Sequence, residues 1–395
     1  MLKMVRNRRI TVNPSSSELL SFEGSIRQVW NLLKYTGIHP DLLLMSTKQH
    51  RTSDIARCLL TWLILLFCVS LGVFQQLQFV IVSWNTENKM DTVSNLLLCD
   101  NFLFTFVAQY QMWYRRREIK QLFKDWKQVE NQTPCFNLPY MKRIINSYYF
   151  YSVLLPVLMM MTVTTWNLME PENSFYFSTY SLIRENFNPI FISASTGFIV
   201  SYLNLIFNLA ELVPAIFFYH IACTVTNLKE EWDAHFKDEQ YIRVIWQRYE
   251  RILHIVDRAN ELFGVVIAVR NLCYVFSLCL SLYYTLVLFR DSTTFFLILL
   301  FWVFSLVYYI WLTNWFMSQL YFSCNQLQKS IADVLSEKWY LLHDNDRHLL
   351  VSFSARLDKG DMAVRPMNLY AISPANLLGV TSVILNYVIV LIQSR

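Results

Sequence analysis

The sequence has little charge and little glycine for its size. Asp, Glu, Lys and Arg make up only 16% of the 395 residues, whereas a soluble globular domain carries roughly 25%. The chain therefore has too little charge to cover an aqueous surface of its own. Only 7 glycines occur and there is no internal repeat. Secondary transporters usually have repeated halves and helices broken by Gly or Pro, so this scarcity disfavours a transporter.

Recognisable catalytic and metal-binding patterns are also missing. The 8 cysteines form no Cys-x-x-Cys pair and most lie in apolar stretches, which predicts buried thiols rather than disulfides or metal ligands. Neither Gly-x-Ser-x-Gly nor His-Glu-x-x-His occurs, and His220 has no evident partner. An enzyme such as a membrane acyltransferase or an intramembrane hydrolase is disfavoured, and no cofactor or metal is expected.

Long apolar blocks dominate what is present. Apolar residues make up 54% of the chain, and a membrane-spanning helix needs about 20 mostly apolar residues in a row. Seven blocks meet this need, at residues 55–82, 93–113, 144–167, 187–223, 263–289, 293–322 and 367–392. The first follows about fifty polar residues, so it is not a signal peptide. The sequence predicts an all-α, polytopic membrane protein with seven transmembrane helices.

The distribution of Lys and Arg predicts the orientation of these helices. Of the basic residues in connecting segments, 28 lie in residues 1–54, 114–143, 226–262 and 324–366, against 3 in residues 84–92, 168–186 and 289–292. Because cytoplasmic loops are enriched in basic residues, the N-terminus is predicted inside and the C-terminus outside. This orientation is the reverse of that of a G-protein-coupled receptor. It also leaves Asn131, in the sequon Asn-Gln-Thr, unglycosylated.

Two of the long inner segments have the apolar spacing of amphipathic helices. The first runs from Tyr241 to Val256 and the second over residues 323–357. They are predicted to extend spans four to six into a cytoplasmic helical anchor, with Trp232, Leu335 and Trp339 as its buried residues. The alternative is two helices lying on the inner leaflet.

The last apolar block ends in a distinctive pattern. Tyr387 is followed by five apolar residues and Gln393, which resembles the C-terminal signature of insect gustatory receptors: Thr-Tyr, five apolar residues, Gln-Phe. Asn386 replaces the Thr and Ser394 replaces the Phe. The residues from Asn260 to Gly264 are similar to the Asn-x-x-Phe-Gly pattern of the same family. The chain thus resembles the insect gustatory receptor family of the insect chemoreceptor superfamily, although residues 330–340 are closer to the odorant receptors.

This resemblance implies a function. Members of the superfamily are tetrameric, ligand-gated cation channels that need no G protein and open in response to tastants or odorants in sensory-neuron plasma membranes. The chain would then be divided into four parts: a cytoplasmic segment (1–54), a ligand-binding helix bundle (55–322), an anchor (323–366) and a pore helix (367–395). Alternatives are an odorant-receptor-type channel subunit or a transporter of a small solute.

The resemblance also implies which residues form the two functional sites. The expected pore and gate residues are Asn386, Tyr387, Ile389, Val390, Gln393 and Ser394. The expected ligand-binding residues lie in the outer halves of spans two to six: Asp100, Asn101, Phe104, Thr165, Trp166, Phe198, Tyr202, Tyr283, Tyr284, Phe296 and Trp302. From the sequence alone, Glu211 and Arg270 are expected to form a structural ion pair, because a charge within a span needs a partner.

Overall fold

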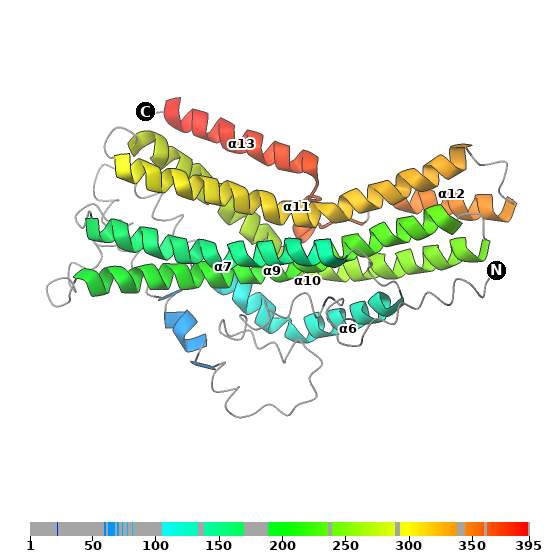
Figure 1. Ribbon diagram of the computed structural model, residues 1–395, viewed down its shortest axis with the longest axis horizontal. Helices are drawn as coiled ribbons and strands as arrows, with labels where there is room; N and C mark the ends of the chain where they lie inside the picture. Colours follow the sequence, from blue (N-terminus) through cyan, green and yellow to red (C-terminus); the bar gives the residue numbers. More distant parts are fainter. Residues whose placement is uncertain are drawn as a thin grey trace.

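The computed structural model describes most of the chain beyond residue 104 (Figure 1). The described residues are 22, 59–60, 62–67, 69–70, 73, 77, 81, 105–132, 138–169, 189–235, 239–288, 293–337, 344–358 and 362–393. Within them every regular element is a helix, which confirms the predicted all-α class. The helices are α6 (Arg116–Gln132), α7 (Leu138–Met169), α9 (Pro189–His235), α10 (Glu239–Leu288), α11 (Thr293–Glu337), α12 (Asp344–Asp358), η6 (Pro366–Asn368) and α13 (Pro374–Gln393).

Three of these helices are far longer than a bilayer is thick. α9 has 47 residues, α10 has 50 and α11 has 45. At 1.5 Å per residue each is roughly 70 Å long, against about 30 Å for the hydrocarbon core. Each therefore continues well beyond any membrane-spanning part. Two stretches of the described helices, Asn208–His235 and Tyr241–Cys279, are long and apolar enough to cross a membrane.

α9 forms the centre of the bundle. It packs against α7, α10 and α11, and Figure 1 shows these helices labelled in one bundle. From Leu209 to Ile221 every side chain of α9 is buried. A helix that is apolar on all sides is typical of a protein core or of a membrane span. Here the neighbouring helices cover all faces of this stretch, so α9 is the core around which they pack.

The amphipathic part of α10 packs as its spacing predicts. Ile242, Ile245, Tyr249 and Ile252 are all buried, and they recur at intervals of three and four, the spacing of one helix face. α12 covers this face through Phe353, whose ring is stacked on Trp246 with centroids 5.6 Å apart. The N-terminal part of α10 and the C-terminal part of α11 thus pack with the short α12 in the same hydrophobic core, at the end of the molecule opposite to α13 (Figure 1).

Candidate functional site

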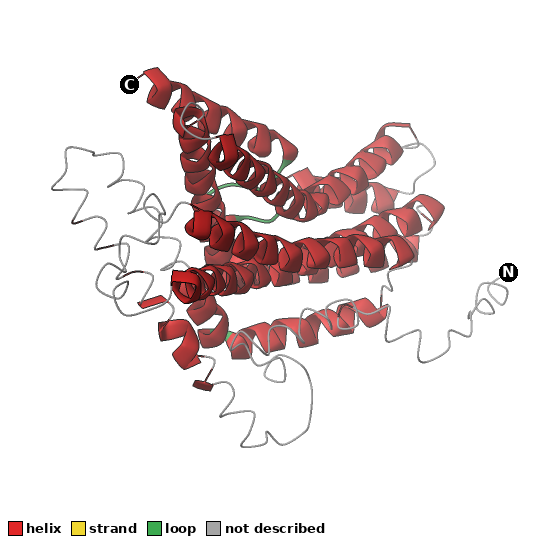
Figure 2. Cartoon of the chain, turned by 60° about the vertical axis from the view of Figure 1, so that its left-hand side comes forward, coloured by secondary structure: helices red, strands yellow, loops and turns green. Residues whose placement is uncertain are grey.

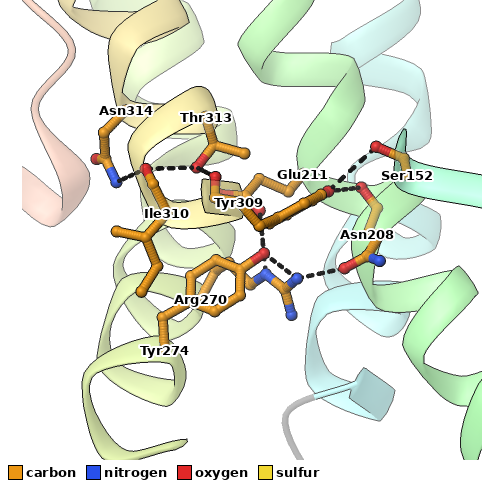
Figure 3. A network of polar contacts seen from close by, with 9 residues as sticks. All are labelled: Ser152, Asn208, Glu211, Arg270, Tyr274, Tyr309, Ile310, Thr313 and Asn314. Carbon is orange, nitrogen blue, oxygen red and sulfur yellow. Dashed lines mark hydrogen bonds and ion pairs between the residues drawn. The ribbon is translucent and has the colours of Figure 1, made fainter. Parts of the chain in front are cut away.

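A network of polar side chains is buried where α7, α9, α10 and α11 meet (Figure 3). At its centre, Arg270 Nε donates a hydrogen bond to Glu211 Oε2 at 3.0 Å, and the two side chains are 4% and 0% exposed. The ion pair expected from the sequence is therefore confirmed. A charged side chain removed from water needs such a partner, because the desolvation penalty is several kcal/mol per ion.

The remaining members of the network form hydrogen bonds with this pair and connect it to the other helices. Arg270 Nη2 also donates to the Asn208 carboxamide and the Tyr274 hydroxyl, and the Tyr274 hydroxyl donates to Glu211 Oε2 at 3.1 Å. The guanidinium lies 3.8 Å from the centroid of the Tyr274 ring. On α11, the Tyr309 hydroxyl lies 3.4 Å from Ser152 Oγ of α7 and from the Asn208 carbonyl oxygen. The network therefore joins four helices.

The further partners of the ion pair were not predicted from the sequence. Tyr274 lies four residues after Arg270, and Asn208 lies three residues before Glu211. These are the spacings at which side chains meet on one helix face. Tyr274 and Asn208 could therefore have been found as polar residues at helical spacing from a charged residue within an apolar block. Tyr309 could not, because its contact depends on how α11 packs against the other helices.

A second buried cluster brings Phe22 against α6 and α9. The Phe22 backbone N–H donates to Glu130 Oε1 at 2.7 Å, and its ring centroid lies 5.1 Å from those of Phe123 and Phe217. His220 lies against the same ring, and its Nε2 is 3.4 Å from Glu130 Oε1. This acidic neighbour of His220 comes from the distant helix α6, so the sequence around His220 could not reveal it.

α13 lies at the edge of the molecule in both overall views (Figures 1 and 2). Among its described side chains, Ile384 is the one that is buried, and it packs with Leu278 and Val303 of the bundle. Asn386, Ile389 and Gln393 are exposed. At about 100° per residue they lie on the face opposite to Ile384. This face of α13 is not covered by described residues of its own chain.

The comparisons with known proteins agree with this architecture. Residues 29–395 match the 7tm chemosensory receptor family. The chain belongs to this family. Its predicted membership in the insect chemoreceptor superfamily is confirmed, and the family is one of multi-pass membrane receptors rather than of enzymes.

Solved structures of one insect receptor share the fold. The chain is similar to the olfactory receptor OR5 from Machilis hrabei in complex with eugenol, with a TM-score of 0.68 and 13% identity over 96% of this chain and 100% of that one. A second structure of the same olfactory receptor matches with a TM-score of 0.64, 12% identity and the same coverage. Curated protein sequences include no match to this chain.

The chemosensory receptor's expected ligand-binding residues are only partly within the described structure. Asp100, Asn101 and Phe104 lie outside the described residues, as do the side chains of Trp166, Tyr283, Tyr284 and Trp302. Phe198 and Tyr202 stack on each other in α9, with ring centroids 6.0 Å apart. Thr165 is exposed and Phe296 is partly buried. The assignment of this group to a ligand pocket stays a prediction.

The receptor's expected pore and anchor residues are placed more fully. Val390 is 58% exposed, like the other described members of the α13 face, while Ser394 and the Tyr387 side chain lie outside the described part. Trp232 is fully buried, Leu335 is partly buried in the same core, and Trp339 lies outside the described residues. Among the described side chains no group of His, Cys, Asp and Glu is arranged to hold a metal ion.

Proposed function

We propose that this receptor is a subunit of a ligand-gated, non-selective cation channel that detects small tastant molecules. Four copies, identical or from related receptor chains, surround a pore lined by α13, in the plasma membrane of sensory neurons. The N-terminus and the helical anchor lie in the cytoplasm, where the 28 basic residues of the connecting segments are retained.

The exposed face of α13 carries this proposal. Asn386 and Gln393 lie on the same side of an otherwise apolar helix, and both are exposed beside Ile389 and Val390. An amide group in hydrocarbon is costly, so a face of this composition favours a water-filled axis between copies over lipid. The apolar residues supply a constriction that closes by dewetting, and the amide oxygens of Gln393 supply a polar ring for a passing cation.

The ligand class is the finer part of the proposal. The Tyr387 to Gln393 pattern favours a gustatory receptor, whereas the structural similarity to an olfactory receptor favours an odorant-type channel subunit. Aromatic residues such as Phe198, Tyr202 and Phe296 suit small apolar molecules in either case. A panel containing sucrose, quinine, caffeine and eugenol separates these alternatives by calcium imaging in cells that express the chain.

Cysteine substitution along α13 tests the pore directly. The variants Asn386→Cys, Ile389→Cys and Gln393→Cys are treated with a permeant methanethiosulfonate reagent while an activating member of the panel is applied. We expect the reagent to change the current in all three. The matched control is Ile384→Cys, on the opposite side of α13, where it packs against Leu278 and Val303 of the bundle, and its current is expected to stay constant.

The outcomes also separate the alternatives. If all three stripe cysteines are inert while the parent receptor conducts, α13 does not line the pore. A solute-dependent flux too small for a channel would instead indicate a transporter.

A further inference from the structure

The segment that joins α12 to α13 is held against α10 by one carboxamide. Asn260 Nδ2 donates to the Ala363 carbonyl oxygen at 2.8 Å, and Asn260 Oδ1 accepts from the Arg365 backbone N–H at 2.9 Å. Asn260 itself is buried. A carboxamide can offer a donor and an acceptor at the same time, so it pairs with backbone groups two residues apart that would otherwise lack these partners.

One helical turn further along α10, a glycine allows this segment to touch the helix. A Cβ atom added at Gly264 would lie 2.9 Å from the Met367 backbone nitrogen and 3.6 Å from the Arg365 carbonyl oxygen. Both are backbone atoms, which cannot rotate away as a side chain can. Within a helix, glycine is less stable than alanine by roughly 0.5–1 kcal/mol. At Gly264 the helix loses this stability, but the absence of a side chain allows α10 to contact the segment before the proposed pore helix directly.

The chain turns sharply at this contact. Met367 has φ 50° and ψ 24°, and Asn368 has φ 57°. Asparagine tolerates this left-handed region, but a residue such as methionine adopts it at a cost of about 1–2 kcal/mol. The turn is closed by hydrogen bonds from the Asn368 N–H to the Arg365 carbonyl at 3.2 Å and from the Leu369 N–H to the Pro366 carbonyl at 3.0 Å. A strained turn keeps this form only while its surroundings hold it.

α10 holds the segment at a third point. Asn271 Nδ2 donates to the Tyr370 hydroxyl at 2.8 Å. At about 100° per residue, Asn260, Gly264 and Asn271 fall within about 40° of one another around the helix. They form one face, which we name the linker face of α10. The neighbouring residue Arg270 reaches in another direction, into the buried network with Glu211 (Figure 3).

We propose that the linker face of α10 is the element that sets the position of the pore helix, with Asn260 as its positioning residue. A helix packed on several sides moves as a unit, so a shift of α10 within the bundle displaces residues 363–370 and with them the start of α13. In Figure 1 α12 and α13 extend in opposite directions from this point. The linker face of α10 therefore contacts the chain between the proposed anchor and the proposed pore helix. This inference rests on the proposed channel function.

The test uses full-length receptor and needs no identified ligand. Asn260→Leu removes both hydrogen bonds at nearly constant volume, and Gly264→Ala displaces the segment without weakening the helix. The matched control is Asn314→Leu, because Asn314 is also buried but donates only to the Ile310 carbonyl of its own helix. Amide hydrogen exchange of residues 362–373 is measured in nanodiscs. Cation current without any added compound is measured in cells and normalised to surface expression. The background is Ile389→Ser, in which a polar side chain at the proposed dewetting constriction is expected to let the pore conduct without ligand.

We expect exchange in residues 362–373 to become about 25-fold faster in Asn260→Leu, since each of the two lost bonds is worth a factor of about five. Gly264→Ala is expected to change exchange in the same direction, and both variants to raise the ligand-free current at least threefold. Asn314→Leu is expected to leave both readouts unchanged. Unchanged exchange or current in Asn260→Leu, or an equal effect of Asn314→Leu, would overturn the inference. Absence of current in the Ile389→Ser parent at normal surface expression would overturn the proposed pore instead. Hydrogen exchange would still test whether the linker face of α10 holds residues 362–373.

Discussion

α9 and α13 are both strongly apolar helices, but their surroundings differ. Along α9 from Leu209 to Ile221 every side chain is buried by α7, α10 and α11. Along α13 the described side chains are exposed except for Ile384. Each carries polar residues within its apolar sequence, and on α9 Asn208 and Glu211 have partners in the same chain. On α13, Asn386 and Gln393 face outwards.

This difference shows that contacts within one chain cover α9 but leave most of α13 uncovered. Burial and ion pairing fix α9 by interactions within one chain, so substitutions there act on the free energy of unfolding. α13 contributes little to that free energy, because most of its surface is not removed from water or lipid by its own chain. Substitutions on its exposed face should therefore change the assembled receptor without changing the stability of the single chain.

The largest expected effect is at the centre of the α9 region. Glu211→Leu leaves the Arg270 guanidinium buried beside an apolar group and is expected to lower the free energy of unfolding by about 3–5 kcal/mol. The measurement is the thermal unfolding midpoint of the receptor in detergent, followed by intrinsic tryptophan fluorescence.

The matched control is the double variant Glu211→Leu with Arg270→Met. Replacing both charges by apolar groups removes the unpaired charge, so most of the lost stability should return. If the single and double variants are equally unstable, the interaction of Arg270 with Glu211 is not what stabilises this region.

Phe22→Ala tests whether the N-terminal segment belongs to the same packed region. Phe22 is buried among Phe123, Phe217 and His220, and truncating a buried phenylalanine typically destabilises a protein by about 3 kcal/mol or more. Phe198→Ala, on the exposed surface of α9, is the control and should shift the unfolding midpoint very little. Equal shifts for the two variants would contradict the docking of the segment.

The sequence predicted the class of the fold and failed mainly where contacts join distant segments. Apolar block length predicted spanning helices, and the charges of Glu211 and Arg270 within such blocks predicted their pairing, because both arguments depend on local composition. His220 contacts Glu130, and Phe22 packs against Phe217. These residues lie about 90 to 200 positions apart in the sequence, and no spacing rule relates them. The pattern from Asn260 to Gly264 was interpreted only as a resemblance to a family. Its partners are backbone groups of residues 363–367, and backbone groups are the same in any sequence.

A smaller effect is expected in the segment between the two regions. Met367→Gly relieves a left-handed methionine and should stabilise the receptor by at most about 1 kcal/mol. The control is Leu369→Gly, at a residue with φ −75° and ψ −41°, where glycine only adds freedom to the unfolded chain and should destabilise by about 0.5–1 kcal/mol. We expect the thermal unfolding midpoint to rise in Met367→Gly and to fall in Leu369→Gly. A loss of stability in both variants would mean that the turn at Met367 is not strained.

The smallest effect on stability is expected at the end of α13, together with a change in conduction. Gln393 is exposed in the single chain, so Gln393→Ala should change the free energy of unfolding by less than about 0.5 kcal/mol. In the proposed assembly the same substitution removes an amide ring at the pore mouth, so the permeability ratio of calcium to sodium, measured from reversal potentials, should change. Val383→Ala, exposed but about 80° away from Gln393 and 120° away from Ile389 around the helix, should alter neither quantity. If Gln393→Ala lowers the unfolding midpoint as much as Phe22→Ala does, then α13 is packed within its own chain and the contrast with α9 is lost. If stability and permeability both stay constant, Gln393 faces lipid, and the pore must be lined by another face of the helix.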